Sequence, residues 1–486
     1  MKQSIWLQLG TAVLVLISLA FCKPQEPVPE FEQRQDSLYI SELRALSGNP
    51  LPNSVYIRDA GMQGLFLLDV ADKTSADNMG TILTTQNNYR FRRTYVGAAS
   101  LLWFGGYSSS SDIGPALETT IRATSELFIP DGNYTQLTAV HLKSNFILRA
   151  NAGKMTINLP KSHASLIKFV NADDPTVSLE HVLIDGLSWS VNSKEKGAYG
   201  PISIDGPSVT DLTIQNCTST DVSPDSTNWL TLKIQAARTA SNIIVRNNNI
   251  QSKRMGCEIF NHDNFNTYAG KNITVSGNTF HDCWFGISLS GPLETLLVDN
   301  NYIKNCSQYG IEIAGAARKV TINNNQFEGT FDKFLEGSND GSGNGTIVGG
   351  MVITNNVTVG FCKGGVQLYN GGAVTFRKNT FRMTGTLEVL HSTTGGLFTE
   401  NYIETTSNKA IICDNTPNNT FTGNTISNKT CPINQATFMA YGSNATNNIL
   451  TNNRLIQGNG GKPYDSLLGG SCQASQNFDE AGNPIP

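Results

Sequence analysis

Glutamate recurs at one position of a short, glycine-led segment in this chain. Glu258 lies in Gly-Cys-Glu-Ile-Phe and Glu312 in Gly-Ile-Glu-Ile-Ala. Hydrolysis of a glycosidic bond needs two carboxyl groups that flank it, about 6.5–9.5 Å apart in an inverting enzyme. We therefore take Glu258 and Glu312 as candidate catalytic carboxylates. His262 and Asp263 follow the Glu258 segment and are candidates to supply the second acid or to position water.

Aligning the glycine-led segments places further side chains in two outward columns, because alternate residues of a strand face the same side. The first column is predicted to hold Ser203, Lys233, Glu258, Ser288, Glu312, a poorly phased position near Glu336, Gln367 and Glu388. The second is predicted to hold Asp205, Gln235, Phe260, Ser290, Ala314 and Tyr369. Carboxylates and amides beside aromatic rings are typical of a sugar groove. The predicted substrate-binding residues are Trp229, Lys233, Gln235, Tyr309, Gln367, Tyr369 and Glu388.

Two alternatives to a glycoside hydrolase stay open. A polysaccharide lyase needs a base that takes the proton next to a uronate carboxylate, and Lys233, Arg238 and Arg254 lie on the appropriate side for that role. Calcium is the cofactor that a lyase would add, whereas the hydrolase is predicted to need none. Glutamates on a solvated strand face are also ordinary, and a Lys233–Glu258 salt bridge would contribute little. The protein would then be a non-catalytic carbohydrate-binding or surface structural protein.

A repeat must position these side chains. Within residues 276–327, an asparagine followed two places later by a large apolar residue occurs at Asn278, Asn301 and Asn325, which are 23 and 24 residues apart. A period near 23 built from short alternating apolar runs predicts a solenoid of strands. The series is predicted to run through Asn216, Asn248, Asn278, Asn301, Asn325, Asn356, Asn379, Asn401, Asn424 and Asn453. Asparagine suits such turns because it tolerates the left-handed conformation and bonds to neighbouring backbone.

The repeat predicts an all-β fold, a right-handed parallel β-helix of about eleven turns, because crossovers between parallel strands are right-handed. At ~4.8 Å per turn the solenoid would be about 50–55 Å long. Glu258 and Glu312 would lie two turns apart, hence roughly 10 Å. Longer gaps between the asparagines, as at 261–272 and 337–350, are predicted to hold loops that wall a groove.

Residues 31–106 lie outside the repeat and are predicted to form a small β region. A predicted helix follows from Asp112 to about Glu126, with Asp112 as its N-cap and Pro115 in its first turn. This helix would cover the first turn of the solenoid, whose apolar edge would otherwise be exposed.

The N-terminal region carries a family resemblance. Val-Tyr-Ile-Arg-Asp at 55–59, Tyr-Arg-Phe-Arg-Arg-Thr-Tyr at 89–95 and Trp-Phe-Gly-Gly at 103–106 follow one another in an order similar to that of pectate-lyase-superfamily proteins, in their rhamnogalacturonase/epimerase-like and phage-tailspike-like group. The resemblance covers most of residues 31–456 and implies a right-handed parallel β-helix that acts on or binds a polysaccharide. The chain lacks the Asn-Thr-Asp, Gly-His-Gly and Arg-Ile-Lys motifs of polygalacturonases, so the resemblance assigns no catalytic set.

The first 22 residues are predicted to direct export. Lys2 precedes the apolar run 11–21, and Leu-Ala-Phe-Cys at 19–22 resembles the lipobox of bacterial lipoproteins, although Phe21 departs from the small residue usual there. The resemblance implies lipidation at Cys22 and a bacterial outer-membrane lipoprotein, periplasmic or surface-exposed, held to the membrane by its lipid alone. An ordinary cleaved signal peptide is the alternative. The predicted division is 1–22 signal peptide, 23–30 tether, 31–106 β region, 107–456 β-helix with its capping helix, and 457–486 C-terminal cover or tail.

The amino-acid composition limits which classes of partner the protein is expected to bind. Charged residues make up 15% of the chain and the net charge is -4, so no basic face for nucleic acid is expected.

Cys283 and Cys306 are predicted one turn apart, close enough for a disulfide, but we favour a column of buried thiols, with Cys413–Cys431 as a weaker pairing. No cysteine pair has zinc-like spacing, so no structural metal is predicted. The sequence thus favours an exported hydrolase acting on an acidic or neutral polysaccharide.

Overall fold

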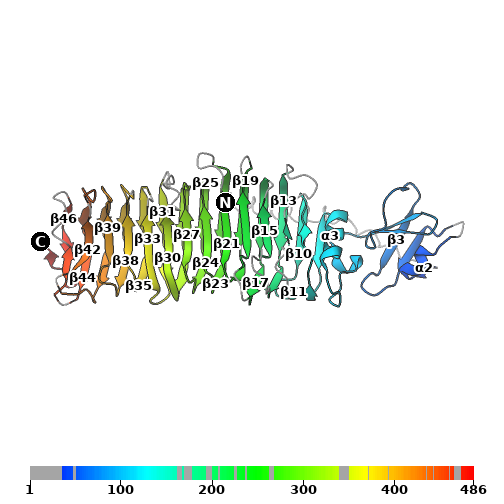
Figure 1. Ribbon diagram of the computed structural model, residues 1–486, viewed down its shortest axis with the longest axis horizontal. Helices are drawn as coiled ribbons and strands as arrows, with labels where there is room; N and C mark the ends of the chain where they lie inside the picture. The colour runs from blue at the N-terminus through cyan, green and yellow to red at the C-terminus, as the bar shows by residue number, and fades with distance from the viewer. Residues whose placement is uncertain are drawn as a thin grey trace, which may run out of the picture. The chain divides into compact units, whose positions relative to one another are not determined.

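The computed structural model (Figure 1) divides into two compact units, residues 1–77 with 81–94 and residues 78–80 with 95–486. It describes residues 36–47, 51–160, 167–168, 178–192, 200–205, 208–223, 227–235, 238–261, 268–338, 350–369, 372–391, 393–433, 435–441, 443–458, 460–464 and 472–485. The predicted signal peptide, the tether and Cys22 lie outside these residues, as do His262 and Asp263. Within the described residues, no helix is both long enough and apolar enough to be a membrane span.

The first unit is a small mixed sheet with one short helix. Its strands follow the order β1 (Ser37–Leu38), β2 (Ser54–Ile57), β3 (Gly64–Asp69), β5 (Arg90–Arg93) and β4 (Ile82–Thr84), and the helix is α2 (Ile40–Arg44). Phe66, Leu83 and Phe91 are fully buried in it. The alternation of apolar and polar residues in these strands therefore produces one buried face.

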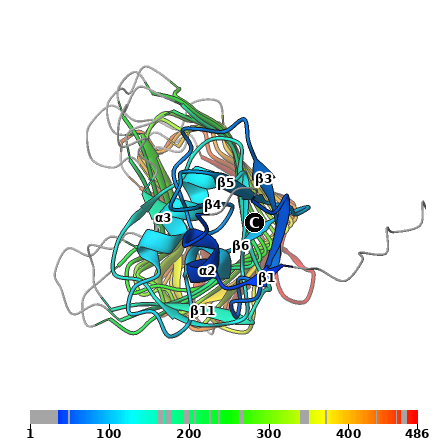
Figure 2. The same ribbon diagram turned by 90° about the vertical axis from the view of Figure 1, so that its right-hand side faces the viewer.

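The second unit is a parallel β-helix of three sheets. Sheet I contains β6 (Ala99–Ser100), β7 (Glu126–Ile129), β10 (Phe146–Ala150), β13 (Leu179–Asp185), β16 (Val209–Gln215), β19 (Ala240–Arg246), β22 (Gly270–Ser276), β25 (Leu293–Asp299), β28 (Arg318–Asn323), β31 (Met351–Thr354), β34 (Val374–Arg377), β37 (Leu397–Thr399), β40 (Thr420–Thr422), β43 (Ile449–Thr451) and β46 (Gln473–Ser475). Figure 2, an end-on view, shows the strands stacked around a common interior.

Sheets II and III complete each turn. Sheet II contains β8 (Gly132–Thr135), β11 (Met155–Leu159), β14 (Ser188–Val191), β17 (Thr218–Asp221), β20 (Asn249–Gln251), β23 (Thr279–His281), β26 (Tyr302–Lys304), β29 (Gln326–Glu328), β32 (Val357–Thr358), β35 (Thr380–Met383), β38 (Tyr402–Thr405), β41 (Thr425–Asn428), β44 (Arg454–Gln457), β47 (Asn477–Phe478) and β48 (Pro484–Ile485). Sheet III contains β9 (Val140–His141), β12 (Ile167–Lys168), β15 (Ile202–Asp205), β18 (Leu230–Ile234), β21 (Met255–Asn261), β24 (Phe285–Ser290), β27 (Tyr309–Ala314), β30 (Thr330–Ser338), β33 (Lys363–Tyr369), β36 (Leu387–Leu390), β39 (Ile411–Asp414), β42 (Ala436–Tyr441) and β45 (Lys462–Tyr464).

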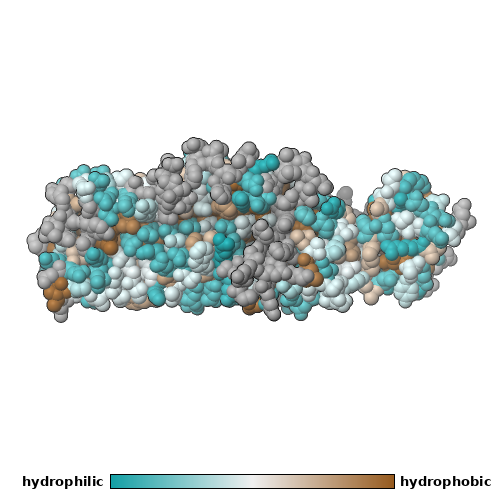
Figure 3. Space-filling view, in the orientation of Figure 1, coloured by the Kyte–Doolittle hydropathy of each residue, from teal (hydrophilic) through white to brown (hydrophobic). Residues whose placement is uncertain are grey.

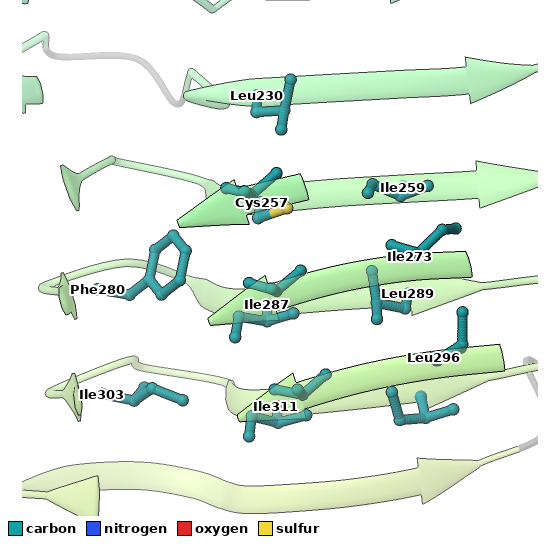
Figure 4. Packing of buried hydrophobic residues seen from close by; sticks show 14 of the residues in the cluster. Leu230, Cys257, Ile259, Ile273, Phe280, Ile287, Leu289, Leu296, Ile303 and Ile311 are labelled. Atoms are coloured by element: carbon teal, nitrogen blue, oxygen red, sulfur yellow. The ribbon is translucent and has the colours of Figure 1, made fainter. Parts of the chain in front are cut away.

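The interior is one continuous apolar core. Inward-facing residues of successive turns stack in columns, as Figure 4 shows for Leu230, Cys257, Ile287 and Ile311. The glycines that lead these strands have a steric reason. A Cβ on Gly310 would lie 2.4 Å from the carbonyl oxygen of Phe334 on the next turn, so only glycine fits this close approach.

A helix covers the start of this core. After the 3-10 helix η1 (Leu101–Phe104), α3 (Gly114–Ala123) buries Leu117 and Ile121 in the same core as the strands. The prediction of Asp112 as N-cap is wrong, because the N-cap is Ile113. Asp112 Oδ1 instead accepts hydrogen bonds from the backbone N–H groups of Gly114 (2.8 Å) and Leu137 (2.9 Å), which ties the helix to the first turn.

The predicted asparagines form a buried ladder. We call Asn248, Asn278, Asn301, Asn325, Asn356, Asn379, Asn401, Asn424, Asn453 and Asn477 the asparagine ladder. In each pair of neighbours, the backbone N–H and Nδ2 of one member donate to Oδ1 of the next, at 2.8–3.1 Å. The prediction for Asn216 is wrong by one residue. Asn216 takes the left-handed turn position that precedes each ladder residue (φ 55°), and Cys217 occupies the ladder position.

The eight cysteines in the described part of the chain have free thiols. Cys283 and Cys306 lie buried on adjacent turns, in the arrangement of buried thiols that the sequence favours. The suggested Cys413–Cys431 disulfide is wrong. Both thiols are unoxidised, and Cys431 Sγ instead donates to the carbonyl oxygen of Gln435, 3.2 Å away.

Candidate functional site

One outward column of sheet III gathers the candidate catalytic residues. Parallel pairing aligns Thr231, Glu258, Ser288, Glu312, Glu336, Gln367 and Glu388 on successive turns. We call the six residues from Glu258 to Glu388 the acid row. Figure 3 shows hydrophilic residues gathered over the part of the β-helix that carries β27, β30 and β33.

The predicted columns are wrong for the turn that contains β18. Lys233 lies beside Asp205 and Phe260 in the second column, and Thr231 takes the place predicted for it. This turn has no leading glycine, so the alignment slipped by two residues, which leaves the side chain on the same face. Gln235 lies beyond the end of β18, where its Nε2 donates to Asp205 Oδ1 at 2.5 Å.

Glu258 is held by the preceding turn. Its Oε2 accepts hydrogen bonds from Asn228 Nδ2 (2.7 Å) and Thr231 Oγ1 (3.0 Å). Burial raises the pKa of the Glu258 carboxyl above its ordinary value, while the Thr231 hydrogen bond and the charge of Arg254 oppose this shift. The carboxyl group is thus both oriented and protonated to a higher pH than a solvated glutamate.

Glu312 lies two turns further along the row, and Ser288 occupies the turn between them. Ser288 Oγ donates to Glu312 Oε2 at 2.5 Å, which orients the Glu312 carboxyl group. Two turns place the Cα atoms of Glu258 and Glu312 about 9.6 Å apart. The spacing expected from the sequence is therefore present, with a small side chain at its centre.

Glu336 follows Glu312 on the adjacent turn and is 5% exposed. The side chain of Tyr309, the first residue of the strand that carries Glu312, is hydrogen-bonded to Glu336. Burial raises the pKa of the Tyr309 phenol to about 12, and the charges of Glu336 and Glu312 add to this effect. A phenol that is neutral at ordinary pH is thus hydrogen-bonded to Glu336 and lies near the charge of Glu312.

The far end of the row contains an ion pair. Lys333 Nζ lies 2.9 Å from Glu388 Oε2, and Gln367 Nε2 donates to the same oxygen at 3.2 Å. Lys333 aligns with Tyr309 on the neighbouring turn. The structure therefore brings the predicted binding residues Gln367 and Glu388 together and adds Lys333, which the sequence did not identify.

The predicted stacking role of Trp229 is wrong, because its side chain is 1% exposed and packs in the core. Trp284 is the exposed aromatic residue beside the row, at 38%. Its ring centroid lies 4.3 Å from that of Phe285, which lies 4.7 Å from Tyr309. The sequence offered one clue, since Trp284 directly precedes the strand that carries Ser288.

The remaining predicted residue, Tyr369, lies at the end of β33, where its ring meets that of His391 with centroids 4.6 Å apart. Among the described residues, no group of three histidine, cysteine or acidic side chains converges as a metal site. His262 and Asp263 fall outside the described residues, so their predicted roles stay predictions.

Comparison with known proteins supports the architecture. Residues 191–381 match the model of a right-handed β-helix region, and residues 39–96 match that of a small four-stranded β-sheet domain of phage tail proteins. No curated protein sequence matches the chain.

Solved structures share the fold at low identity. The N-terminal fragment of bacteriophage phi29 gene product 12 is 14% identical (TM-score 0.52), over 78% of this chain and 66% of that one. The A-module of Azotobacter vinelandii mannuronan C-5 epimerase AlgE6 is 12% identical (TM-score 0.50), over 80% of this chain and all of the module. The tailspike of Acinetobacter baumannii phage AM24 is 16% identical (TM-score 0.47), over 71% of this chain, which spans 64% of that protein. The chain is a right-handed parallel β-helix protein, the fold that its sequence resemblance implied.

Proposed function

We propose that this protein is a polysaccharide-active enzyme that hydrolyses a glycosidic bond at the acid row, with inversion of configuration. One observation carries the proposal. Glu258, a half-buried glutamate with a raised pKa, lies two turns from Glu312, whose Oε2 accepts a hydrogen bond from Ser288. A carboxyl group that stays protonated to higher pH is suited to act as general acid, and a second carboxylate across the bond can act as general base.

Glu258 is the proposed general acid. Burial keeps its carboxyl protonated at higher pH, and Asn228 and Thr231 fix its orientation by bonding to Oε2. This leaves Oε1 to donate its proton to the departing glycosidic oxygen. Arg254 nearby would stabilise the carboxylate that remains.

Glu312 is the proposed general base. The Ser288 hydroxyl donates to its Oε2 and orients the carboxylate, which would take a proton from the attacking water. Ser288 is the one residue of the acid row between the two glutamates, and its small side chain leaves more room there than a larger one would. An inverting site requires such a gap, with the water on the face of the sugar opposite the acid.

The neighbouring side chains are proposed to bind the sugars on either side of the cleaved bond. Trp284 and Tyr309 present aromatic rings, and Gln367, Lys333 and Glu388 present hydrogen-bonding groups. His262 and Asp263 keep their proposed part in supplying an acid or positioning water. The substrate of the mannuronan epimerase is itself a polysaccharide, which supports a glycan as the class of substrate.

The test compares Glu258→Gln and Glu312→Gln with wild type on a panel of soluble polysaccharides, by release of reducing ends. General acid–base catalysis contributes about 10²–10⁴-fold, so each variant should lose at least about 100-fold in rate. Glu400→Gln is the matched control, since Glu400 is an exposed carboxylate paired with Arg377 away from the row. It should keep the wild-type rate within about twofold.

Three results would overturn the proposal. Full activity of both variants would place the chemistry elsewhere. Unsaturated products that absorb in the ultraviolet would identify a lyase, and a calcium requirement can then be tested with a chelator. Retardation in a polysaccharide gel without any product would identify a binding protein. The anomeric configuration of the first product, followed by proton NMR, tests inversion separately.

A further inference from the structure

A pocket lies at the ends of three successive strands of sheet III, β36, β39 and β42. Its volume is about 700 Å³, and its lining includes His391, Thr394, Asn415, Pro417, Asn444 and Thr446. Small-molecule sites typically have volumes of about 300–1,000 Å³. The three segments that form it come from neighbouring turns, so the pocket extends along the β-helix.

Hydrogen bonds between neighbouring turns hold the walls of this pocket in place. Asn419 Oδ1 accepts from the N–H of Gly396 (2.8 Å), and the N–H of Asn419 donates to Asn448 Oδ1 (2.9 Å). Thr394 Oγ1 donates to the carbonyl oxygen of Pro417 at 3.0 Å. Asn419 and Asn448 are fully buried, and they connect the three segments in the manner of the asparagine ladder. The pocket is thus formed before any ligand binds, which reduces the entropic cost of binding.

The lining favours hydroxyl groups over charged groups. Hydroxyl and amide side chains and one imidazole supply donors and acceptors, and Pro417 supplies an apolar surface. The lining residues that the structure describes include no carboxylate, lysine or arginine. A uronate or phosphate would find no lysine or arginine among them, whereas an uncharged sugar would find both donors and acceptors of hydrogen bonds.

Strand β36 connects the pocket to the acid row, because it carries Glu388 and leads into His391, which lines the pocket. Glu388 and His391 are three residues apart at the end of β36, and Gln367 and Tyr369 are two apart on β33. Three residues of strand span about 10 Å, roughly the length of two sugar units. The ring of Tyr369, at the end of β33, meets that of His391 in the pocket lining, with centroids 4.6 Å apart.

We propose that this pocket is a binding subsite for an uncharged sugar unit of the glycan that crosses the acid row. That the pocket binds part of the same glycan that is cleaved at the acid row rests on the proposed function. That the pocket binds an uncharged sugar rests on its own lining. The glycan would then contain uncharged units, either throughout or beside acidic ones, and a polymer made only of uronates would not satisfy the pocket.

The test blocks the pocket without removing its scaffold. Asn444 is exposed, so Asn444→Trp adds a large side chain at the lining without disturbing the core. Ile433→Trp is the matched control, because Ile433 is 71% exposed and precedes the opposite end of β42. Affinity electrophoresis would use galactomannan and dextran as uncharged probes, xanthan as a mixed probe, and polygalacturonate and alginate as uronate probes.

We expect an uncharged or mixed polysaccharide to retard the wild type. Asn444→Trp should weaken that binding at least tenfold, and Ile433→Trp should change it by less than twofold. The proposal is overturned if Asn444→Trp binds as wild type does, if the uronate polymers alone retard the protein, or if no probe does. Hydrolysis is scored separately by reducing ends. Loss of binding in Asn444→Trp with full activity of Glu258→Gln would reject the proposed catalysis and keep the pocket.

Discussion

Removing one side chain of the asparagine ladder should destabilise the β-helix far more than removing the side chain of an exposed asparagine. Asn301 is 1% exposed and bonds to both adjacent ladder members. Asn301→Ala deletes four hydrogen bonds: two that Oδ1 accepts from Asn278 and two that Nδ2 donates, to Val275 O and Asn325 Oδ1. The backbone bond from Asn301 N–H to Asn325 Oδ1 would remain.

The expected loss follows from these bonds. A buried hydrogen bond contributes about 1 kcal/mol net, and a buried partner left unpaired adds about 1–3 kcal/mol. The backbone N–H of Asn278 is one such partner, since it donates to Asn301 Oδ1 at 3.0 Å. The free energy of unfolding should therefore fall by about 5–7 kcal/mol. Asn249→Ala, at an exposed position on β20, should change it by less than about 0.5 kcal/mol.

The assay combines guanidinium unfolding with amide hydrogen exchange, because long repeat proteins do not always unfold in one cooperative step. Exchange at the Asn278 amide reports the broken bond directly, and exchange at turns far along the helix reports the remaining stability. A loss below about 1 kcal/mol, or an Asn278 amide as protected as in wild type, would refute the view that the ladder carries this stability.

Two further predictions concern pH. The pKa of Glu258 is raised above its ordinary 4.5 in the folded protein. Relative to Glu258→Gln, the wild type should therefore lose stability as pH rises from below 4.5 through the folded pKa. Urea unfolding of both proteins at pH 3.5 and 7 measures this loss, and an equal difference in stability at the two pH values would contradict it. The pKa of Glu294 is lowered to about 2 by hydrogen bonds from Arg318 and Lys319. Its stabilising effect should be complete above about pH 4.5 and disappear as pH falls toward 2, so acid titrations of wild type and Glu294→Gln should converge there, and parallel curves would show that the pair does not stabilise the fold.

The repeat made the fold predictable from sequence, because the period and the alternation of apolar residues both report on one stacked architecture. Glu258 and Glu312 could be placed two turns apart for the same reason, since parallel pairing carries a position from turn to turn. Asn216 was misassigned because asparagine suits both the left-handed turn and the ladder position beside it, and sequence spacing does not separate the two.

The rest of the site depended on turns that interrupt the period. Trp229 and Lys233 belong to a turn without a leading glycine, where the direction of a side chain depends on how the inserted residues fold back. Both Lys333 and Trp284 were missed because they lie outside the aligned columns. Lys333 lies at a register irregularity within β30, and Trp284 directly precedes β24. Their importance appears only when the ion pair with Glu388 and the contact with Phe285 are seen.

The stacking of turns makes distance in this molecule a matter of counting. Asn278 and Asn301 are 23 residues apart, so deleting residues 278–300 would remove one whole period and leave the ladder continuous. Glu312 would then lie beside Glu258, about 4.8 Å away at the Cα atoms, close to the ~5–5.5 Å separation of carboxyl groups in retaining glycosidases. A period gained or lost beyond β36 would not change the distance between Glu258 and Glu312 in either form of the protein. The number of turns between two side chains can thus set the stereochemistry of a reaction, while the turns outside them are free to vary in number.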